Sequence, residues 1–242
     1  MQAAETGGEA FVLVERVVDP YVVCFHEPRG FRAEQIRGLR NKLMVMNPDD
    51  APRSLTVTSA IQGEGKTVTA INLAISFAEL EDHRVALLDF DLRKPCVGRF
   101  LGLDEGPGVV ELLLGGARLD EVLRPSGIQD LDVITAGRDK VLPSELFQSR
   151  RLDELLAHLK EDYSYILIDT PPALPISDAG SVGRKCDGTL MVVGLERAPR
   201  KLVKEALRNL EEQGSNVLGV FVTGVRNADP GSDSRYRYPE LE

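Results

Sequence analysis

The sequence predicts an α/β fold, with one domain built around a mostly parallel central sheet that is flanked by helices. Short apolar runs alternate with segments of helical periodicity along most of the chain, an order typical of β–α–β units that join parallel strands. Several of these runs are apolar almost without interruption, as in strands buried on both faces. The length of 242 residues suits one large domain of this kind.

The first elements are identified by their periodicity. Apolar residues recur at helical spacing through residues 31–46, so this segment is predicted to be a helix. A strand is predicted at residues 54–60, and the small residues of 66–81 indicate a helix that packs closely on a sheet. The nearly continuous apolar run 84–91 predicts a second strand with both faces buried.

The later elements continue the alternation. We expect two short helices within residues 108–123, one or two over 143–162, and another over 199–214 with Gly214 as its stop signal. The remaining strands are predicted at residues 131–137, 165–170, 188–195 and 216–225. Because open parallel sheets bind ligands at the carboxyl ends of their strands, the chemistry is expected just after each apolar run.

The chain is predicted to divide into three parts. Residues 1–30 are interpreted as an N-terminal arm, because prolines interrupt its one apolar stretch, FVLVERVV, which could form a short strand. Residues 31–228 form the α/β domain. Residues 229–242 are predicted to be a flexible polar tail that carries Tyr236 and Tyr238.

Composition excludes several classes of function. The net charge of −9 argues against nucleic acid as a partner. Three cysteines and three histidines are scattered without metal-ligand spacing, which predicts no zinc site and indicates reduced thiols in a cytosolic protein. No stretch approaches the length of a transmembrane helix and no signal peptide is visible, so membrane association is expected to depend on a partner protein.

A glycine-containing turn, SAIQGEGKTVT, follows the strand at 54–60. Gly63 and Gly65 allow the backbone to point its N–H groups inward, and a helix is predicted to begin at Lys66, so a phosphate would meet free donors and the helix dipole. Lys66 is expected to reach the β- and γ-phosphates, and the Thr67 hydroxyl to bind Mg²⁺. The general phosphate-loop pattern has glycine where this chain has Ala60, and the alternative is an ordinary strand-to-helix turn. The predicted nucleotide contacts are Gly63, Glu64, Gly65, Lys66, Thr67 and Val68.

Carboxylates end two further predicted strands. Asp89 and Asp91 lie two residues apart, which on one strand places both side chains on the same face. Asp169 ends another buried strand, as does the second carboxylate of phosphate-loop nucleotide hydrolases. Thr67, Asp91 and Asp169 are therefore the predicted magnesium ligands. The alternative for each carboxylate is a role in a turn or a helix cap.

These motifs resemble those of the bacterial tyrosine kinases of capsular and exopolysaccharide synthesis. The segments GEGKT (63–67), LLDFDLRKP (87–95) and ILIDTPP (166–172) are similar to the three Walker-type motifs of that family. LPSEL (142–146) is similar to a segment between the second and third motifs, and the family tolerates a residue other than glycine at Ala60. The resemblance extends from about residue 20 to the end of the chain and implies a P-loop NTPase-like fold.

The resemblance implies an autokinase that uses ATP and Mg²⁺ to phosphorylate tyrosines near the C-terminus of a neighbouring subunit. Tyr236 and Tyr238 occupy the place of these acceptors, where many members of the family have a longer run of tyrosines. The predicted catalytic residues are Lys66, Asp89 and Asp91. Asp89 is the candidate base for the tyrosine hydroxyl, although the division of roles between the two carboxylates stays open. Thr223 stands where the family often has an asparagine beside the nucleotide base.

The resemblance also implies partners. The Glu-x-x-Arg-x-x-Arg element through which the family assembles into rings falls on Glu34, Arg37 and Arg40, within a roughly 120° arc of the helix at 31–46. The alternative is a solvated helix face with an internal ion pair. The further expected partners are a transmembrane polysaccharide co-polymerase that acts as activator and a cognate tyrosine phosphatase. The protein is then expected in the cytoplasm, at the inner face of the membrane through that activator.

Two competing functions stay open. One is an ATPase switch similar to the division-site and partitioning ATPases, which carry an additional lysine five residues before the loop lysine, where this chain has Ile61. The other is a nucleotide-binding module with little catalysis, docked on a membrane regulator of polysaccharide length. The presence of tyrosines in the tail disfavours the ATPase switch. Their small number keeps the nucleotide-binding module open.

Overall fold

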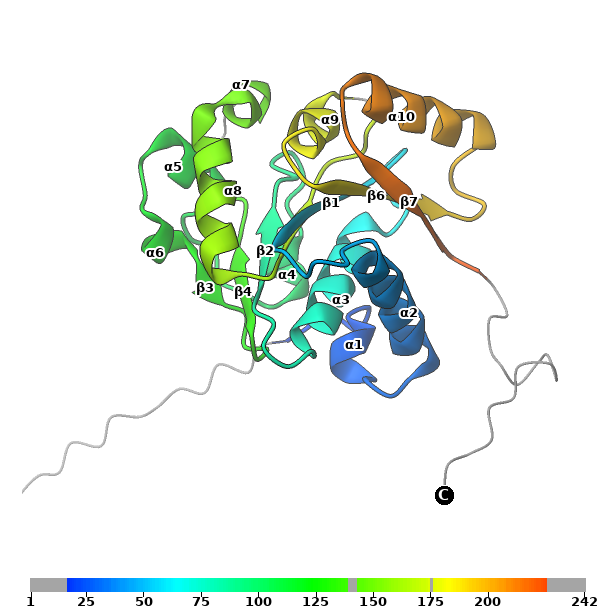
Figure 1. Ribbon diagram of the computed structural model, residues 1–242, viewed down its shortest axis with the longest axis horizontal. Helices are drawn as coiled ribbons and strands as arrows, with labels where there is room; N and C mark the ends of the chain where they lie inside the picture. Colours follow the sequence, from blue (N-terminus) through cyan, green and yellow to red (C-terminus); the bar gives the residue numbers. More distant parts are fainter. Residues whose placement is uncertain (1–16, 139–142, 175, 226–242) are drawn as a thin grey trace, which may run out of the picture.

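Seven strands form one central sheet in the computed structural model of the chain (Figure 1). The structure describes residues 17–138, 143–174 and 176–225. The strands are β1 (Arg53–Ser59), β2 (Val85–Asp89), β3 (Arg124–Pro125), β4 (Leu131–Ile134), β5 (Tyr165–Asp169), β6 (Gly188–Gly194) and β7 (Val217–Thr223). Their order across the sheet is β3-β4-β2-β5-β1-β6-β7. Neighbouring strands are parallel except for the β3–β4 pair at one edge, which confirms the predicted mostly parallel sheet.

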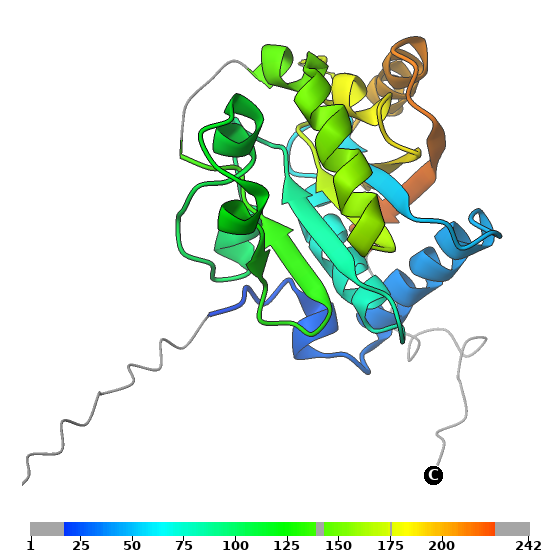
Figure 2. The same cartoon turned by 60° about the vertical axis from the view of Figure 1, so that its left-hand side comes forward.

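Helices cover both faces of the sheet (Figures 1 and 2). Within the described residues they are α1 (Val23–His26), α2 (Phe31–Val45), α3 (Lys66–Ala78), α4 (Val97–Phe100), α5 (Val109–Leu114), α6 (Leu119–Val122), α7 (Pro143–Gln148), α8 (Arg150–Asp162), α9 (Asp178–Gly183) and α10 (Arg200–Glu212). Helices α1 to α4 share one apolar cluster with the first face of the sheet. Helices α5 to α10 pack on the opposite face, in two further clusters.

Strand β2 shows why the apolar runs lack alternation. Val85 and Leu87 point to the cluster that contains α3, whereas Ala86 and Leu88 point to the cluster that contains α8, and all four are fully buried. A strand covered by helices on both faces needs apolar side chains at every position. Each leucine side chain buried in this way stabilises the fold by about 1.5–3 kcal/mol.

The predicted strands and helices are present, with boundaries that shift by a few residues. The main differences are elements too short to leave a periodic pattern, namely α4, α9 and the antiparallel strand β3. The last part of the predicted arm, residues 17–30, contains α1 and packs on the domain, with Val22 and Cys24 in the core. The tail, and all but the last two residues of the FVLVERVV segment, lie outside the described residues.

The sheet register brings three predicted motifs to one edge. Asp169 at the end of β5 is level with Val57 on β1 and with Asp89 on β2. The phosphate loop, which follows β1, therefore lies beside both carboxylate segments. None of the helices in the described part of the chain is long and apolar enough to cross a membrane.

Candidate active site

The turn after β1 has the backbone of a phosphate-binding loop. Gly63 and Gly65 adopt left-handed conformations, with φ of 86° and 91°, which side chains disfavour and glycine tolerates. Gly65 caps α3, which begins at Lys66, and no side chain caps this helix end. The first N–H groups of α3 are therefore left to an incoming anion, as the sequence predicts.

Glu64 fixes the loop to the rest of the sheet. Its side chain is 1% exposed and accepts hydrogen bonds from Ile61 N (2.8 Å) and from Gly194 N at the end of β6 (3.0 Å). The Thr223 hydroxyl on β7 donates to the Glu64 carbonyl oxygen (2.7 Å). Glu64 and Thr223 thus hold the loop in place. The side chain of Glu64 does not line the cavity described below.

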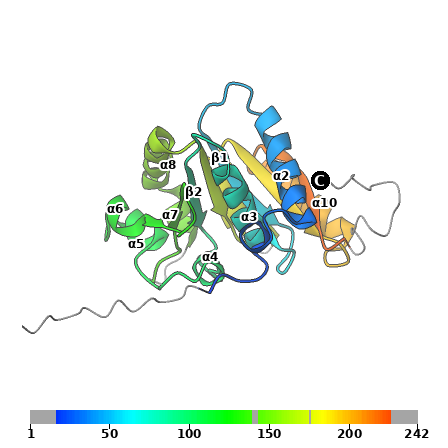
Figure 3. The same ribbon diagram turned by 90° about the horizontal axis from the view of Figure 1, so that it is seen from below.

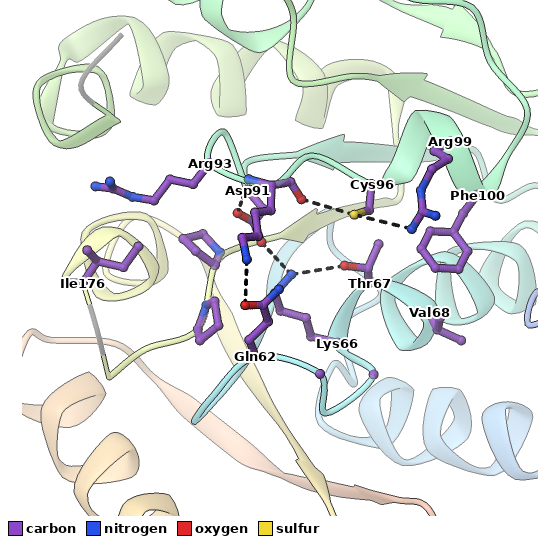
Figure 4. Close-up of a pocket in the computed structure, with 15 residues that line it drawn as sticks. Gln62, Lys66, Thr67, Val68, Asp91, Arg93, Cys96, Arg99, Phe100 and Ile176 are labelled. Atoms are coloured by element: carbon purple, nitrogen blue, oxygen red, sulfur yellow. Dashed lines mark hydrogen bonds and ion pairs between the residues drawn. The ribbon is translucent and has the colours of Figure 1, made fainter. Parts of the chain in front are cut away.

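Lys66 lies at the centre of a charged cluster (Figure 4). Its ammonium nitrogen is 2.8 Å from Asp91 Oδ2, 3.1 Å from Thr67 Oγ1 and 3.7 Å from Asp169 Oδ1. Burial by itself lowers the pKa of Lys66, but the charges of Asp169 and Asp91 more than offset it, so the pKa is raised. The lysine is therefore held in its cationic form at the mouth of the loop.

Asp169 has one buried oxygen that makes no hydrogen bond and lies 3.7 Å from Lys66 Nζ. The carboxyl group is fully buried, and its Oδ2 accepts a hydrogen bond from the Thr67 hydroxyl (2.6 Å). Its Oδ1 is buried without a hydrogen-bond partner. Burial raises the pKa of Asp169 to about 6, against the lowering effects of Lys66 and Thr67. A buried acceptor of this kind is costly unless something pairs with it.

The oxygens around Lys66 fit a magnesium ion that is shared with a nucleotide. Thr67, Asp91 and Asp169 together offer a hydroxyl and two carboxylates, and Mg²⁺ is usually held by one or two carboxylates together with phosphate oxygens. Within the part of the chain that the structure describes, no group of three or more His, Cys, Asp or Glu residues forms a metal site by itself. A hydroxyl and two carboxylates would leave the other coordination positions of Mg²⁺ to phosphate oxygens and water.

Asp89 differs from its sequence prediction. Strand β2 ends at Asp89, so Asp91 lies in the following loop and the two are not neighbours on one strand face. Asp89 Oδ1 accepts from Asp91 N (3.1 Å), and Oδ2 accepts from Cys96 N and Val97 N (3.0 Å each). Burial and the charge of Asp169 raise the pKa of Asp89 to about 8, against these hydrogen bonds. Both oxygens are used within the loop, so this geometry offers no support for Asp89 as the base.

A cavity of about 350 Å³ opens above the phosphate loop. Five of the six predicted nucleotide contacts line it, as does Asp91; the exception is Glu64. Arg93, Lys94 and Arg99 add positive charge to its walls, and Lys94 Nζ crosses to Gln62 Oε1 (2.9 Å). Sequence reasoning did not single out Arg99, because a lone arginine on a one-turn helix carries no pattern.

The predicted oligomerisation residues are brought together, but their charges are largely used inside the subunit. Arg37 donates two hydrogen bonds of 2.7 Å to the carboxylate of Glu79, which follows α3, and also pairs with Glu34. Arg40 is 9% exposed and donates to the Ser76 carbonyl oxygen (2.6 Å). The hydrogen bonds that Arg37 donates to Glu79 raise the pKa of Arg37. The internal ion pair of the alternative interpretation is therefore present, and the arginines join α2 to α3.

The tyrosines differ sharply in exposure. Tyr163 and Tyr165 are 3% and 2% exposed, whereas Tyr21 is 65% exposed. Tyr236 and Tyr238, the predicted acceptors, lie outside the described residues. Of the tyrosines in the described segments, only Tyr21 is exposed.

Comparison with known proteins identifies relatives. Residues 53–184 match the family model described as an AAA domain. The tyrosine-protein kinase YwqD of Bacillus subtilis (strain 168) is 32% identical over 205 residues, which cover 85% of this chain and 86% of YwqD.

Solved structures of similar fold include a tyrosine kinase domain. The kinase domain of the Escherichia coli tyrosine kinase ETK superimposes with a TM-score of 0.80 at 28% identity, covering 94% of this chain and 85% of that one. The septum site-determining protein MinD of Pyrococcus horikoshii, solved with Mg-ADP, has a TM-score of 0.62 at 22% identity, covering 74% of this chain and 72% of that one. The likeness to MinD concerns the fold alone.

Proposed function

Because the chain belongs to the family of bacterial tyrosine-protein kinases, we propose that it transfers the γ-phosphoryl group of ATP to Tyr236 and Tyr238 of a neighbouring copy. One observation carries this proposal. Lys66 and Asp91 line a cavity at the N-terminus of α3 together with the phosphate loop, and the buried Asp169 lies 3.7 Å from Lys66. This arrangement supports binding and activation of a nucleoside triphosphate.

The side chains have separate tasks in this mechanism. The free N–H groups at the start of α3 bind the phosphates, and Lys66 exchanges its ion pair with Asp91 for the β- and γ-oxygens. Thr67, Asp91 and Asp169 would hold Mg²⁺, which when bound neutralises charge on the phosphates. Since phosphoryl transfer has a loose transition state, positioning and charge stabilisation supply most of the catalysis.

The structure favours Asp91 over Asp89 as the carboxylate nearest to the acceptor. Asp91 lines the cavity, whereas Asp89 is fully buried and holds the loop that carries Asp91. A free tyrosine has a pKa near 10, so a nearby carboxylate helps to accept its proton. We therefore assign Asp89 to loop positioning and Asp91 to the reacting centre.

Assembly and context belong to the same proposal. Copies form a ring through the exposed face of α2, where the side chain of Glu34 is 61% exposed. Arg37 and Arg40 would contribute only by exchanging their internal bonds for bonds to the neighbour. A transmembrane polysaccharide co-polymerase activates the kinase at the inner face of the membrane, and a cognate phosphatase reverses the modification. The switch regulates capsule or exopolysaccharide synthesis.

The test is autophosphorylation of the purified chain with ATP and Mg²⁺, read with an anti-phosphotyrosine antibody, with and without a cytoplasmic fragment of the activator. Lys66→Met should abolish the signal without unfolding the domain, and a Tyr236→Phe/Tyr238→Phe variant should lose most of it. Undiminished phosphotyrosine in Lys66→Met would contradict the proposal. ATP hydrolysis without phosphotyrosine would favour an ATPase switch, and nucleotide binding with neither would favour a binding module.

A further inference from the structure

The segment that carries Tyr21 is bonded to residues around the nucleotide cavity. The main chain of Asp19 donates a hydrogen bond to the carbonyl oxygen of Phe100 (2.9 Å), and Phe100 lines the cavity. Figure 3 shows this segment passing next to α4 on its way to α1. The segment that carries Tyr21 is therefore attached to one wall of the active site.

A buried asparagine attaches the same segment to a second wall. Asn72 Nδ2 on α3 donates both to the Tyr21 carbonyl oxygen (3.0 Å) and to the Val68 carbonyl oxygen (2.8 Å). Two oxygens bound to one nitrogen lie within about 6 Å of each other. Val68 also lines the cavity, directly after the magnesium-binding Thr67. The main chain of Tyr21 is thus fixed beside the first turn of α3.

The anchoring of this segment leaves the tyrosine side chain free. Asn72 Oδ1 also accepts from Cys24 N (2.8 Å), and Val22 and Cys24 are buried in the core, so the main chain on both sides of the residue is held. The side chain of Tyr21 remains 65% exposed. Exposed side chains change rotamer within nanoseconds, far faster than kinases turn over. The hydroxyl can therefore change position quickly while its backbone stays in place.

We propose that Tyr21 is a further phosphate acceptor, modified by the active site of its own subunit. This inference rests on the proposed kinase function and adds an acceptor outside the tail. The bond between the γ-phosphorus and the oxygen that bridges it to the β-phosphate breaks, and a bond from Tyr21 Oη to that phosphorus forms. The phenolic proton passes to solvent and ADP leaves. The modification adds about −1.5 to −2 charges beside the cavity.

Phosphopeptide mapping of tail-free variants tests the site. The Tyr236→Phe/Tyr238→Phe variant, incubated with ATP, Mg²⁺ and the activator fragment, should retain phosphotyrosine that maps to Tyr21. Adding Tyr21→Phe should lower the signal to that of Lys66→Met. Adding Tyr163→Phe instead, at a buried tyrosine, should leave it unchanged. Because Tyr21→Phe keeps the ring and every main-chain contact, its melting temperature should match that of the parent.

The outcomes separate the two hypotheses. The Tyr21 site is overturned if the wild type is phosphorylated on its tail but the tail-free variant carries no label, or carries it on another tyrosine. The kinase function would still stand in that case. No phosphotyrosine in any chain overturns both. Mixing Lys66→Met chains with active tail-free chains tests the route. Label on Tyr21 of only the active chains supports transfer within one subunit, and label on the inactive chains overturns it.

Discussion

The two ends of helix α3 both carry dense charge, but they treat it in opposite ways. At the C-terminal end, Arg37 forms a bidentate pair with Glu79, and Arg40 binds a carbonyl oxygen of the helix. At the N-terminal end, Lys66 balances two carboxylates, and Asp169 retains a buried oxygen without a hydrogen bond. The charged groups named at the C-terminal end all have partners within the subunit, whereas one carboxylate oxygen at the N-terminal end makes no hydrogen bond.

This difference separates a structural junction from a binding site. A buried polar atom without a partner costs free energy, so folding alone would favour its removal or its pairing. Its presence at Asp169 indicates that a ligand completes the arrangement. The α2–α3 junction needs no ligand to balance its charges, and we expect it to stabilise the subunit itself. The predictions below test this contrast.

Asp169→Asn should produce the largest effect, and only on activity. Losing a metal-binding carboxylate should lower the rate of phosphoryl transfer by about 10²–10³-fold, measured as initial autophosphorylation rate. The nucleotide-free protein should melt at the same or a higher temperature, because burial disfavours the charged form of this carboxyl group and raises its pKa. A clear fall in melting temperature would show that Asp169 is primarily structural.

Glu79→Gln should affect stability and spare the nucleotide site. Removing the charge that pairs with Arg37 should lower the free energy of unfolding by about 1–3 kcal/mol, measured by urea denaturation. The affinity for a fluorescent ATP analogue should be unchanged. Glu81→Gln, at an exposed glutamate two residues away, is the matched control and should have little effect on either. Equal stability of the two variants would contradict the assigned role of the junction.

Acidic pH should weaken Mg²⁺–ATP binding. The Asp169 carboxyl has its pKa raised from 3.8 to about 6 by burial, so it becomes protonated below pH 6 and loses its affinity for the metal. The dissociation constant should rise up to about tenfold for each pH unit below 6, measured by calorimetric titration. The same group has the opposite effect on folding. Its contribution to the stability of the nucleotide-free protein is present below about pH 4 and is lost as pH rises through 6.

The control for this pH dependence is Asp169→Asn. That variant should bind Mg²⁺–ATP more weakly than the wild type. Its dissociation constant should stay the same between pH 5 and pH 7, because the titrating carboxyl group is absent. A wild-type affinity that stays constant over the same range would show that Asp169 does not contact the metal.

Thr223→Val should have the smallest effect. It removes the hydroxyl that holds the Glu64 carbonyl oxygen, at a cost of about 0.5–1.5 kcal/mol. ATP affinity should fall by several-fold because the loop is less well positioned. Thr223→Ser keeps the hydroxyl and should bind nearly as the wild type does. Serine as impaired as valine would contradict a role for the hydroxyl, and impairment of serine alone would point to the methyl group.

Local patterns predict where most of the candidate active site lies. Lys66 and Thr67 follow a strand and begin a helix, and Asp169 ends a buried apolar run, so each motif carries its own structural context. Parallel strands then bring these ends to one edge of the sheet. The fold class follows from the same alternation, since βα units leave few possible arrangements.

Pairing between distant residues could not be predicted in this way. Arg37 meets Glu79 from 42 positions away, and Glu64 reaches Gly194 across 130 positions. Asp89 was predicted to be the base, on the same face as Asp91, because a continuing strand would place both side chains there. Instead β2 ends at that residue, and the backbone N–H groups of the next turn surround the carboxylate. The decisive groups are main-chain N–H donors, which every residue except proline carries, so no sequence motif identifies them.

The central position of β1 has a consequence for synthesis. Its partners are β5, which begins at Tyr165, and β6, which begins at Gly188. The phosphate loop is therefore translated early, but its supports, including the Glu64 contact at Gly194, emerge from the ribosome much later. A nascent chain cannot close the ATP site until most of the protein has been made. A chain truncated before β6 would carry the complete GEGKT motif and still lack a nucleotide site.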